Sequence, residues 1–370
     1  GMVHGQIKNN GTVTRRPTGS QPNLLQVSKG PVRRMVEPRY KDISIGGRYN
    51  RHVTVSIDFS GQELRITGSE AKDPSFIEAY TGGGTYVDEY GMTRQRVKDV
   101  HSVTGCMFAL EVLRRELDEP LLGILEMDEF GKMSYFQFRS IVEDGVLALS
   151  QLSLSEDDAG KVVKAVNGVR KMAKAVNFLI CYLGQPSTLA GNIGIPKAFA
   201  ERIMAAVFAS YARLAPWQAE MIALARKQGF VTTAYGNWKH VSPDILAKDG
   251  GKRSRAERQA VNQIVQGCAA DILKIVLTQS ERQGIFSNPH KAVMYAPVYD
   301  EVLSSVHMDY CFEYVEKMQD IMNLTPPGHA IPMMGEVSVG MNWCDQVELG
   351  DRPAERKLTE LFDKWVKEAA

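Results

Sequence analysis

The stretch VSIDFSGQELRI, residues 55–66, combines a strand pattern, a turn and two acids within twelve positions. Alternating and β-branched apolar residues predict a strand over 51–58 that ends on Asp58. A Ser-Gly pair then indicates a turn, and a helix is expected to begin near Gln62. Glu63 follows Asp58 by five positions. Two acids around a turn fit a catalytic site, but they fit a helix cap or a solvated loop equally well.

The composition is that of an ordinary globular protein, with 44% hydrophobic and 24% charged residues among 370. The five cysteines are far apart and form no CxxC pair, which favours reduced thiols over a disulfide framework or a zinc site. No run of about 18 apolar residues is present, so we expect no membrane span.

The net charge of +1 argues neither for nor against nucleic acid, but the charges are segregated. Residues 116–129 are acidic and would repel DNA placed along them. Each basic cluster fits either a nucleic-acid-binding face or a solvated helix face. The basic clusters lie at 15–16, 33–34, 170–174 and 252–255.

Strands near both ends of the chain enclose a helical middle, which predicts an α+β fold with a helical insertion. Residues 1–35 are expected to be extended chain and loops, and 81–91 a loop whose glycines lack the ending of a phosphate-binding P-loop. The further predicted elements are helices within 102–226, a hairpin at 228–241, a helix at 254–281, a hairpin at 291–307, a helix at 308–323, a strand at 335–340 and a C-terminal helix.

Asp300 and Glu301 lie in the turn of the second predicted hairpin, 242 residues after Asp58. Sheet formation can bring such carboxylates together, and paired carboxylates can hold two Mg²⁺ ions about 4 Å apart for phosphoryl transfer. Magnesium takes only one or two protein carboxylates, with substrate phosphates as further ligands. Acids at turns are common, so spacing alone leaves the metal site as one interpretation among others.

Arg170, Lys174, Phe178 and Tyr182 recur every four residues and therefore share one stripe of a predicted helix. Two cations and two rings suit a cleft wall that holds a nucleoside triphosphate, because the cations can meet phosphates and the rings can lie beside a base. The alternative is an amphipathic helix with a basic, aromatic edge.

Asn262 and Gln266 lie four residues apart on an otherwise apolar predicted helix. Side-chain amides can donate to the minor-groove acceptors that all base pairs share. The same residues could instead be buried polar groups that pair with backbone.

Three of these stretches resemble motifs of the family A DNA polymerases. DFSGQELRI (58–66) resembles the first catalytic motif, RKMAKAVNFLICYLG (170–184) the fingers helix, and VYDEV (298–302) the second catalytic motif. The resemblance extends in the same order through TRRPTGSQPNLLQ (14–26), KDVHSVTG (98–105), AERQAVNQIVQGCAADILK (256–274) and VGMNWCDQ (339–346).

The resemblance implies a polymerase palm, an antiparallel sheet with packed helices, interrupted by mainly helical fingers. Residues 1–80 and 228–370 would form the palm and 81–227 the fingers, with an extra insertion at about 105–168. We expect that insertion to face solvent or a partner.

The resemblance also implies the site. Asp58 and Asp300 would bind two catalytic Mg²⁺ ions, the Phe59 carbonyl would be a further ligand, and Glu301 would support the primer end. The reaction would join a dNTP to a primer 3′-hydroxyl on a DNA template.

For the incoming dNTP, Glu63 would be the steric gate that excludes a ribose 2′-hydroxyl. Arg170 and Lys174 would hold the triphosphate. Phe178 would pack against the sugar and base, and Tyr182 would stand beside the templating position.

For primer–template DNA, Arg16, Asn262 and Gln266 would touch the minor groove near the primer terminus, and Tyr299 would donate a hydrogen bond there. Two departures from the family bear on these contacts. Leu183 stands where the family has glycine, and Pro297 stands where the family has glutamine.

The family's exonuclease-like domain and thumb have no counterpart in the sequence. We therefore expect weak DNA binding and distributive synthesis, with the thumb either lost by truncation or carried by a separate polypeptide that docks on residues 1–50. The expected location is the cytoplasm of a bacterial or phage-infected cell, in replication or repair. The alternatives are a non-catalytic DNA-binding or scaffolding subunit and a single-subunit RNA polymerase, against which Glu63 argues.

Overall fold

The computed structural model describes residues 5–8, 11–12, 14, 16–28, 30–39, 51–88, 90–95 and 97–369. Arg15 and much of the segment 1–50, on which we expect a thumb-bearing partner, lie outside these residues.

A five-stranded antiparallel sheet forms the base of the molecule, with strand order β11-β10-β3-β9-β8. The central strand β3 contains the predicted strand 51–58, and its side chains from His52 to Ile57 are buried. Neighbours on both sides supply its hydrogen bonds, and helix α12 packs against it. The strands are β3 (His52–Phe59), β8 (Ala292–Val298), β9 (Glu301–His307), β10 (Gly335–Gly340) and β11 (Gln346–Gly350), and α12 is Cys311–Met322.

The turn after β3 is fixed by one glycine and one buried arginine. Gly61 adopts the left-handed conformation, with φ +59°, that L side chains rarely adopt, and it is the N-cap of helix α2 (Gln62–Ala71). Arg65 is 1% exposed and donates to the Ser60 carbonyl at 2.7 Å and to the Pro332 carbonyl at 2.9 Å. The end of β3 is therefore tied to the segment before β10.

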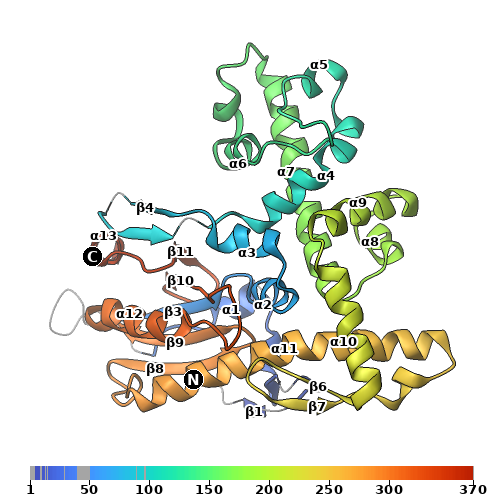
Figure 1. The fold of residues 1–370 in the computed structure, drawn as a ribbon. Coiled ribbons are helices and arrows are strands. Elements are labelled where there is room, and N and C mark those ends of the chain that lie inside the picture. The colour runs from blue at the N-terminus through green and yellow to red at the C-terminus, as the bar shows by residue number, and fades with distance from the viewer. Residues whose placement is uncertain are drawn as a thin grey trace.

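In the helical region, residues 97–228, helices α4 to α7 stand above the sheet and α10 reaches down beside it (Figure 1). Its main contact joins α4 to α7, because both helices turn apolar faces toward each other. The helices here are α4 (Val100–Glu116), α5 (Glu119–Leu122), α6 (Tyr135–Asp144), α7 (Glu156–Cys181), α8 (Pro186–Ile193), α9 (Lys197–Ser210) and α10 (Leu214–Gln228).

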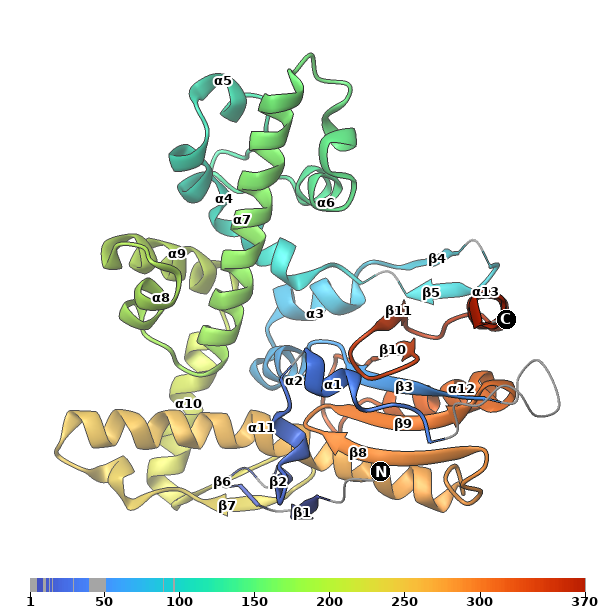
Figure 2. The ribbon, with the colours of Figure 1, turned by 180° about the vertical axis from the view of Figure 1, so that it is seen from behind.

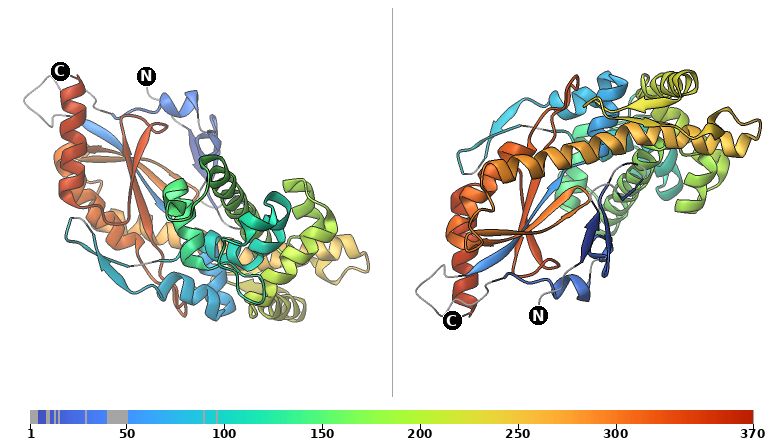
Figure 3. Two further views of the ribbon diagram at one scale, coloured as in Figure 1. Left: turned by 90° about the horizontal axis from the view of Figure 1, so that it is seen from above. Right: turned by 90° about the horizontal axis from the view of Figure 1, so that it is seen from below.

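The long helix α11 (Gly250–Arg282) runs from the sheet to beneath the helical region (Figure 3). By length and composition it could cross a membrane, but 72% of the apolar stretch is buried inside the structure. Its apolar residues therefore serve as core. The strands β6 (Phe230–Thr232) and β7 (Trp238–His240) form the predicted hairpin before it, with Gly236 at the turn.

Three local expectations need correction. The predicted loop 81–91 contains strand β4 (Thr85–Val87), which pairs with β5 (Thr93–Gln95) because β-branched and aromatic residues favour extended chain. This hairpin lies beside β11 in both views (Figure 2). Edge strand β11 was not predicted. The expected extended N-terminal segment also contains a strand pair, β1 (Gln6–Lys8) and β2 (Thr18–Ser20), and helix α1 (Pro31–Arg34).

Candidate active site

The structure brings Asp58 and the second hairpin to one end of the sheet. Asp58 lies opposite Glu301 on β9 and opposite Glu336 on β10. The Phe59 N–H donates to the Asp300 carbonyl at 3.2 Å, which joins the ends of β3 and the β8–β9 turn. Asp58, Glu301 and Glu336 on three strands and Asp300 in the β8–β9 turn therefore lie at one end of the sheet, although they come from three separate stretches of the sequence.

The electrostatics of this cluster favour a bound cation. The pKa of Asp58 is raised to about 8, first because the surrounding protein displaces hydration and then because Asp300, Glu301 and Glu336 are negatively charged. The pKa of Asp300 is also raised by desolvation. A divalent cation would relieve this repulsion.

The donor set fits magnesium. Among the described residues, no three His, Cys, Asp or Glu side chains are arranged to hold a metal ion by themselves. Asp58 and Asp300, with the Phe59 carbonyl at the same strand end, supply hard oxygens. Mg²⁺ is usually bound by one or two carboxylates and completes its shell with water and substrate phosphates.

The Glu301 carboxylate is fixed by two hydrogen bonds. Its Oε1 accepts from Ser56 Oγ at 2.5 Å and from the Trp343 indole N–H at 2.8 Å. Trp343 belongs to the VGMNWCDQ motif and also stacks under the Arg33 guanidinium, 4.0 Å from the ring centre. These contacts orient the Glu301 carboxylate beside Asp58.

The hairpin turn itself is strained at Tyr299, a non-glycine residue with φ +60°. Its side chain is 36% exposed and faces away from the core. Pro297 lies on edge strand β8, where the missing N–H is tolerated. The structure therefore accommodates proline here without disturbing the acids.

The predicted stripe on α7 has its polar groups outside the core. Arg170 Nε donates to Asp99 Oδ2 at 2.7 Å, whereas Lys174 is exposed and has no acidic partner in the part of the chain that the structure describes. Phe178 is 44% exposed, and its ring centre lies 6.4 Å from that of His101. Burial, together with the Arg170 and Lys174 charges, lowers the pKa of His101 to about 4.

The stripe ends in contact with Glu63. The Tyr182 hydroxyl donates to Glu63 Oε2, and Arg16 Nη2 pairs with Glu63 Oε1. Gln266 Nε2 donates to the Tyr182 hydroxyl at 3.2 Å. Leu183, next along the chain, has φ +50° where glycine would be unstrained, and it packs against the core.

Asn262 lies on the same half-exposed face of α11 as Gln266, between buried neighbours. Its Oδ1 is buried and has no hydrogen-bond partner among the described residues. The structure thus brings together the predicted residues from the N-terminal segment, α2, α7 and α11.

Sequence reasoning missed four residues of this region: Asp99, His101, Trp343 and Glu336. Three of them lie inside motifs that we quoted, so a residue-by-residue reading of KDVHSVTG and VGMNWCDQ could have found them. Glu336 is opposite Asp58 only through strand register, for which the sequence carries no local signal.

Comparisons with known proteins agree with this geometry. The sequence profile of DNA polymerase family A matches residues 158–345, slightly more than half of the chain. The thermostable DNA polymerase I of Thermus aquaticus is 24% identical over 353 residues, which cover 94% of this chain and 33% of the relative. That of Thermus filiformis is 30% identical over 348 residues, covering 93% of this chain and 33% of the relative.

A solved structure, the POL domain of Pol1 from M. smegmatis in complex with DNA primer-template and dNTP, has the same fold. The TM-score is 0.66 at 19% identity, covering 92% of this chain and 48% of that one. The α+β fold with an antiparallel sheet and a helical insertion is thereby confirmed. This chain spans about a third of the length of the Thermus relatives. With the matched profile and the collinear motifs together, the chain belongs to DNA polymerase family A.

Proposed function

We propose that this chain is the palm-and-fingers part of a template-directed DNA polymerase. It would transfer a nucleotide from a dNTP to a primer 3′-hydroxyl, with two Mg²⁺ ions held by Asp58, Asp300 and the Phe59 carbonyl. The observation that carries the proposal is the meeting of Asp58 and Asp300 at one sheet end, next to Glu63, which accepts a hydrogen bond from Tyr182 at the end of α7.

The primer 3′-hydroxyl would attack the α-phosphate, and pyrophosphate would leave. Bound magnesium stabilises the attacking and leaving oxygens in such reactions. The chain's own residues do the positioning. Arg170 and Lys174 neutralise and orient the triphosphate, since charge-assisted contacts to phosphate are strong. Glu301, fixed by Ser56 and Trp343, supports the primer end.

Glu63 would select the sugar. Its carboxylate is fixed from both sides by Arg16 and Tyr182, so it cannot easily swing away from a ribose 2′-hydroxyl. Phe178, exposed on α7, would pack against the sugar and base. The Tyr182 hydroxyl must leave Glu63 if the ring is to make room for a templating base.

Primer–template DNA and dNTPs are the proposed partners, with Arg16, Asn262, Gln266 and Tyr299 contacting the duplex. A separate polypeptide carrying a thumb or exonuclease is part of the proposal, as are distributive synthesis by the chain alone and a role in bacterial or phage replication or repair. The corresponding location is the cytoplasm of a bacterial or phage-infected cell.

Single-nucleotide addition to a short primer–template tests the function. We expect the unsubstituted chain with Mg²⁺ to add the templated dNTP, and to add rNTP poorly. Asp58→Ala and Asp300→Ala should each abolish addition.

Two results would contradict the proposal. Efficient rNTP addition would favour an RNA polymerase, and DNA binding without any addition at high enzyme concentration would favour a non-catalytic subunit. In the second case, Mg²⁺-dependent dNTP binding would separate a missing partner from a chain without a nucleotide site.

A further inference from the structure

One carboxylate oxygen is shared by two arginines from different parts of the helical region. Asp99 Oδ2 accepts from Arg170 Nε at 2.7 Å and from Arg139 Nη1 at 3.2 Å. Ser102 Oγ donates to the same oxygen at 2.5 Å. The Asp99 side chain is 14% exposed, so its carboxylate is largely desolvated, whereas about a third of each arginine is exposed.

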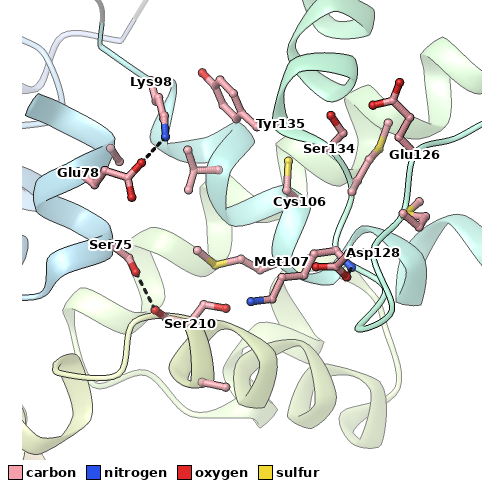
Figure 4. Close-up of a pocket in the computed structure, with 16 residues that line it drawn as sticks. Ser75, Glu78, Lys98, Cys106, Met107, Glu126, Asp128, Ser134, Tyr135 and Ser210 are labelled. Atoms are coloured by element: carbon pink, nitrogen blue, oxygen red, sulfur yellow. Dashed lines mark hydrogen bonds and ion pairs between the residues drawn. The ribbon is translucent and has the colours of Figure 1, made fainter. Parts of the chain in front are cut away.

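Arg139 belongs to α6, within the segment 105–168 that we expected to face solvent or a partner. A second residue of α6 reaches the same aspartate, because the Asp99 N–H donates to the Tyr135 hydroxyl at 2.9 Å. Tyr135 and Lys98 both line a cavity of about 700 Å³, whose other walls include the loop before α6 and helix α3 (Pro74–Thr81) (Figure 4). Helix α6 therefore contacts Asp99, the partner of Arg170, directly. The expectation that segment 105–168 faces solvent or a partner describes α6 only in part.

Because Arg139 and Arg170 donate to the same Asp99 oxygen, Arg139 affects how readily Arg170 leaves Asp99. Arg170 holds Asp99 through Nε alone, so a guanidinium that turns to place Nε as well as Nη on a triphosphate gives up this contact. A desolvated carboxylate left without a partner is strongly unfavourable. Arg139 remains on Asp99 when Arg170 leaves, and it also weakens the hold of Asp99 on Arg170 beforehand, because two cations divide one acceptor.

We propose that Arg139 is a positioning residue for the incoming nucleotide: it keeps Asp99 paired so that Arg170 can move to the triphosphate. The inference rests on the proposed polymerase function.

A direct contact between Arg139 and phosphate is disfavoured by its surroundings. Arg139 Nη2 pairs with Glu143 on the same helix. The residue also lines a cleft of about 970 Å³ whose walls include Glu143, Asp144 and Asp351. These carboxylates repel phosphate, which leaves the route through Asp99 as the effective one.

Steady-state single-nucleotide addition tests the inference with Arg139→Gln. We expect the KM for dNTP to rise about tenfold, the loss of one charge-assisted contact, while kcat changes less than about twofold. Arg139→Lys should restore the KM in part. The matched control is Arg202→Gln, because Arg202 is half exposed, pairs with Glu111 and lies over the Phe199 ring, away from Asp99, and its KM should not change.

The decisive variant is Asp99→Asn, which keeps a good helix cap for α4 but removes the charge. In this background Arg139→Gln should leave the KM unchanged, since no carboxylate remains to be kept paired. An equal KM increase with and without the Asp99 charge would overturn the inference and indicate direct phosphate contact. If Asp99→Asn does not fold, as judged by thermal unfolding, an unchanged KM in Arg139→Gln alone overturns it.

The two proposals fail differently. If the unsubstituted chain adds no nucleotide, the polymerase function fails and this inference fails with it. If addition is normal and Arg139→Gln has no effect on KM, only the inference fails.

Discussion

The sheet end at Asp58 and the outer stripe of α7 both carry concentrated charge, but they neutralise it differently. At the sheet end, Glu301 is held by neutral donors, and Asp58 has no cationic partner among the described residues. On α7, the groups expected to meet substrate are already engaged by carboxylates, with Arg170 on Asp99 and Tyr182 on Glu63.

This difference separates two kinds of functional group. The acids of the sheet are crowded and partly desolvated, so without a bound cation they lower the free energy of unfolding. On the α7 stripe, Arg170 and Tyr182 already have intramolecular partners and must exchange them for the substrate. Substitutions should therefore have opposite effects on stability in the two regions.

Asp58→Asn should produce the largest effect. Nucleotide addition should fall about a thousandfold or more, because a lost metal ligand removes several kcal/mol of transition-state stabilisation. The free energy of unfolding without metal should stay the same or rise, because folding no longer has to protonate or desolvate a carboxyl whose pKa is raised to about 8. Primer extension and chemical denaturation measure the two quantities. The surface variant Glu360→Gln is the control. A lower free energy of unfolding in Asp58→Asn would contradict the claim that the acids of the sheet end destabilise the metal-free fold.

Glu63→Ala should change sugar selection next most strongly. With the side chain removed, rNTP addition relative to dNTP addition should rise about 10- to 100-fold, because the 2′-hydroxyl no longer clashes. Glu63→Gln keeps the volume and should retain most of the discrimination. The ratio of kcat/KM values for rNTP and dNTP decides this, and equal loss in both variants would mean that charge rather than size excludes the ribose.

The sheet site was predictable because its signals are local. The pattern of 55–66 contains the strand, the turn glycine and the helix start, and the structure has β3, Gly61 and α2 at those positions. The hairpin carrying Asp300 was likewise predicted, except that Glu301 already begins β9. That β3 and β9 pair and bring the two acids together was expected from the family resemblance, because no local pattern encodes it.

The partners on α7 could not be predicted in this way. Asp99 meets Arg170 across 71 residues, and Arg139 meets Asp99 across 40. Periodicity places Arg170 on an exposed stripe but says nothing about which acid reaches it. Such pairings depend on how α4, α6 and α7 pack, which no local pattern encodes.

Lys174→Ala and Arg170→Ala form a matched pair on one stripe. Both should raise the KM for dNTP about tenfold by removing a cation from the triphosphate. Only Arg170→Ala should also lower the free energy of unfolding, by about 1–2 kcal/mol, because it removes a partner of the desolvated Asp99. Kinetics and denaturation on both variants are needed. A stability loss in Lys174→Ala as large as in Arg170→Ala would show that both cations have internal partners.

Tyr182→Phe should have the smallest effect and the opposite sign. The substitution removes the hydroxyl that donates to Glu63 and accepts from Gln266, so less free energy is needed to move the ring from its resting place. A net hydrogen bond of about 0.5–1 kcal/mol corresponds to a KM for dNTP that falls about twofold to fivefold. In a Glu63→Ala background the same substitution should have a smaller effect, because only the Gln266 contact remains to be lost. A KM that rises in Tyr182→Phe would mean that the hydroxyl contacts the bound substrate. The Tyr182 hydroxyl would then resemble the acids of the sheet end, whose binding partner comes from outside the chain.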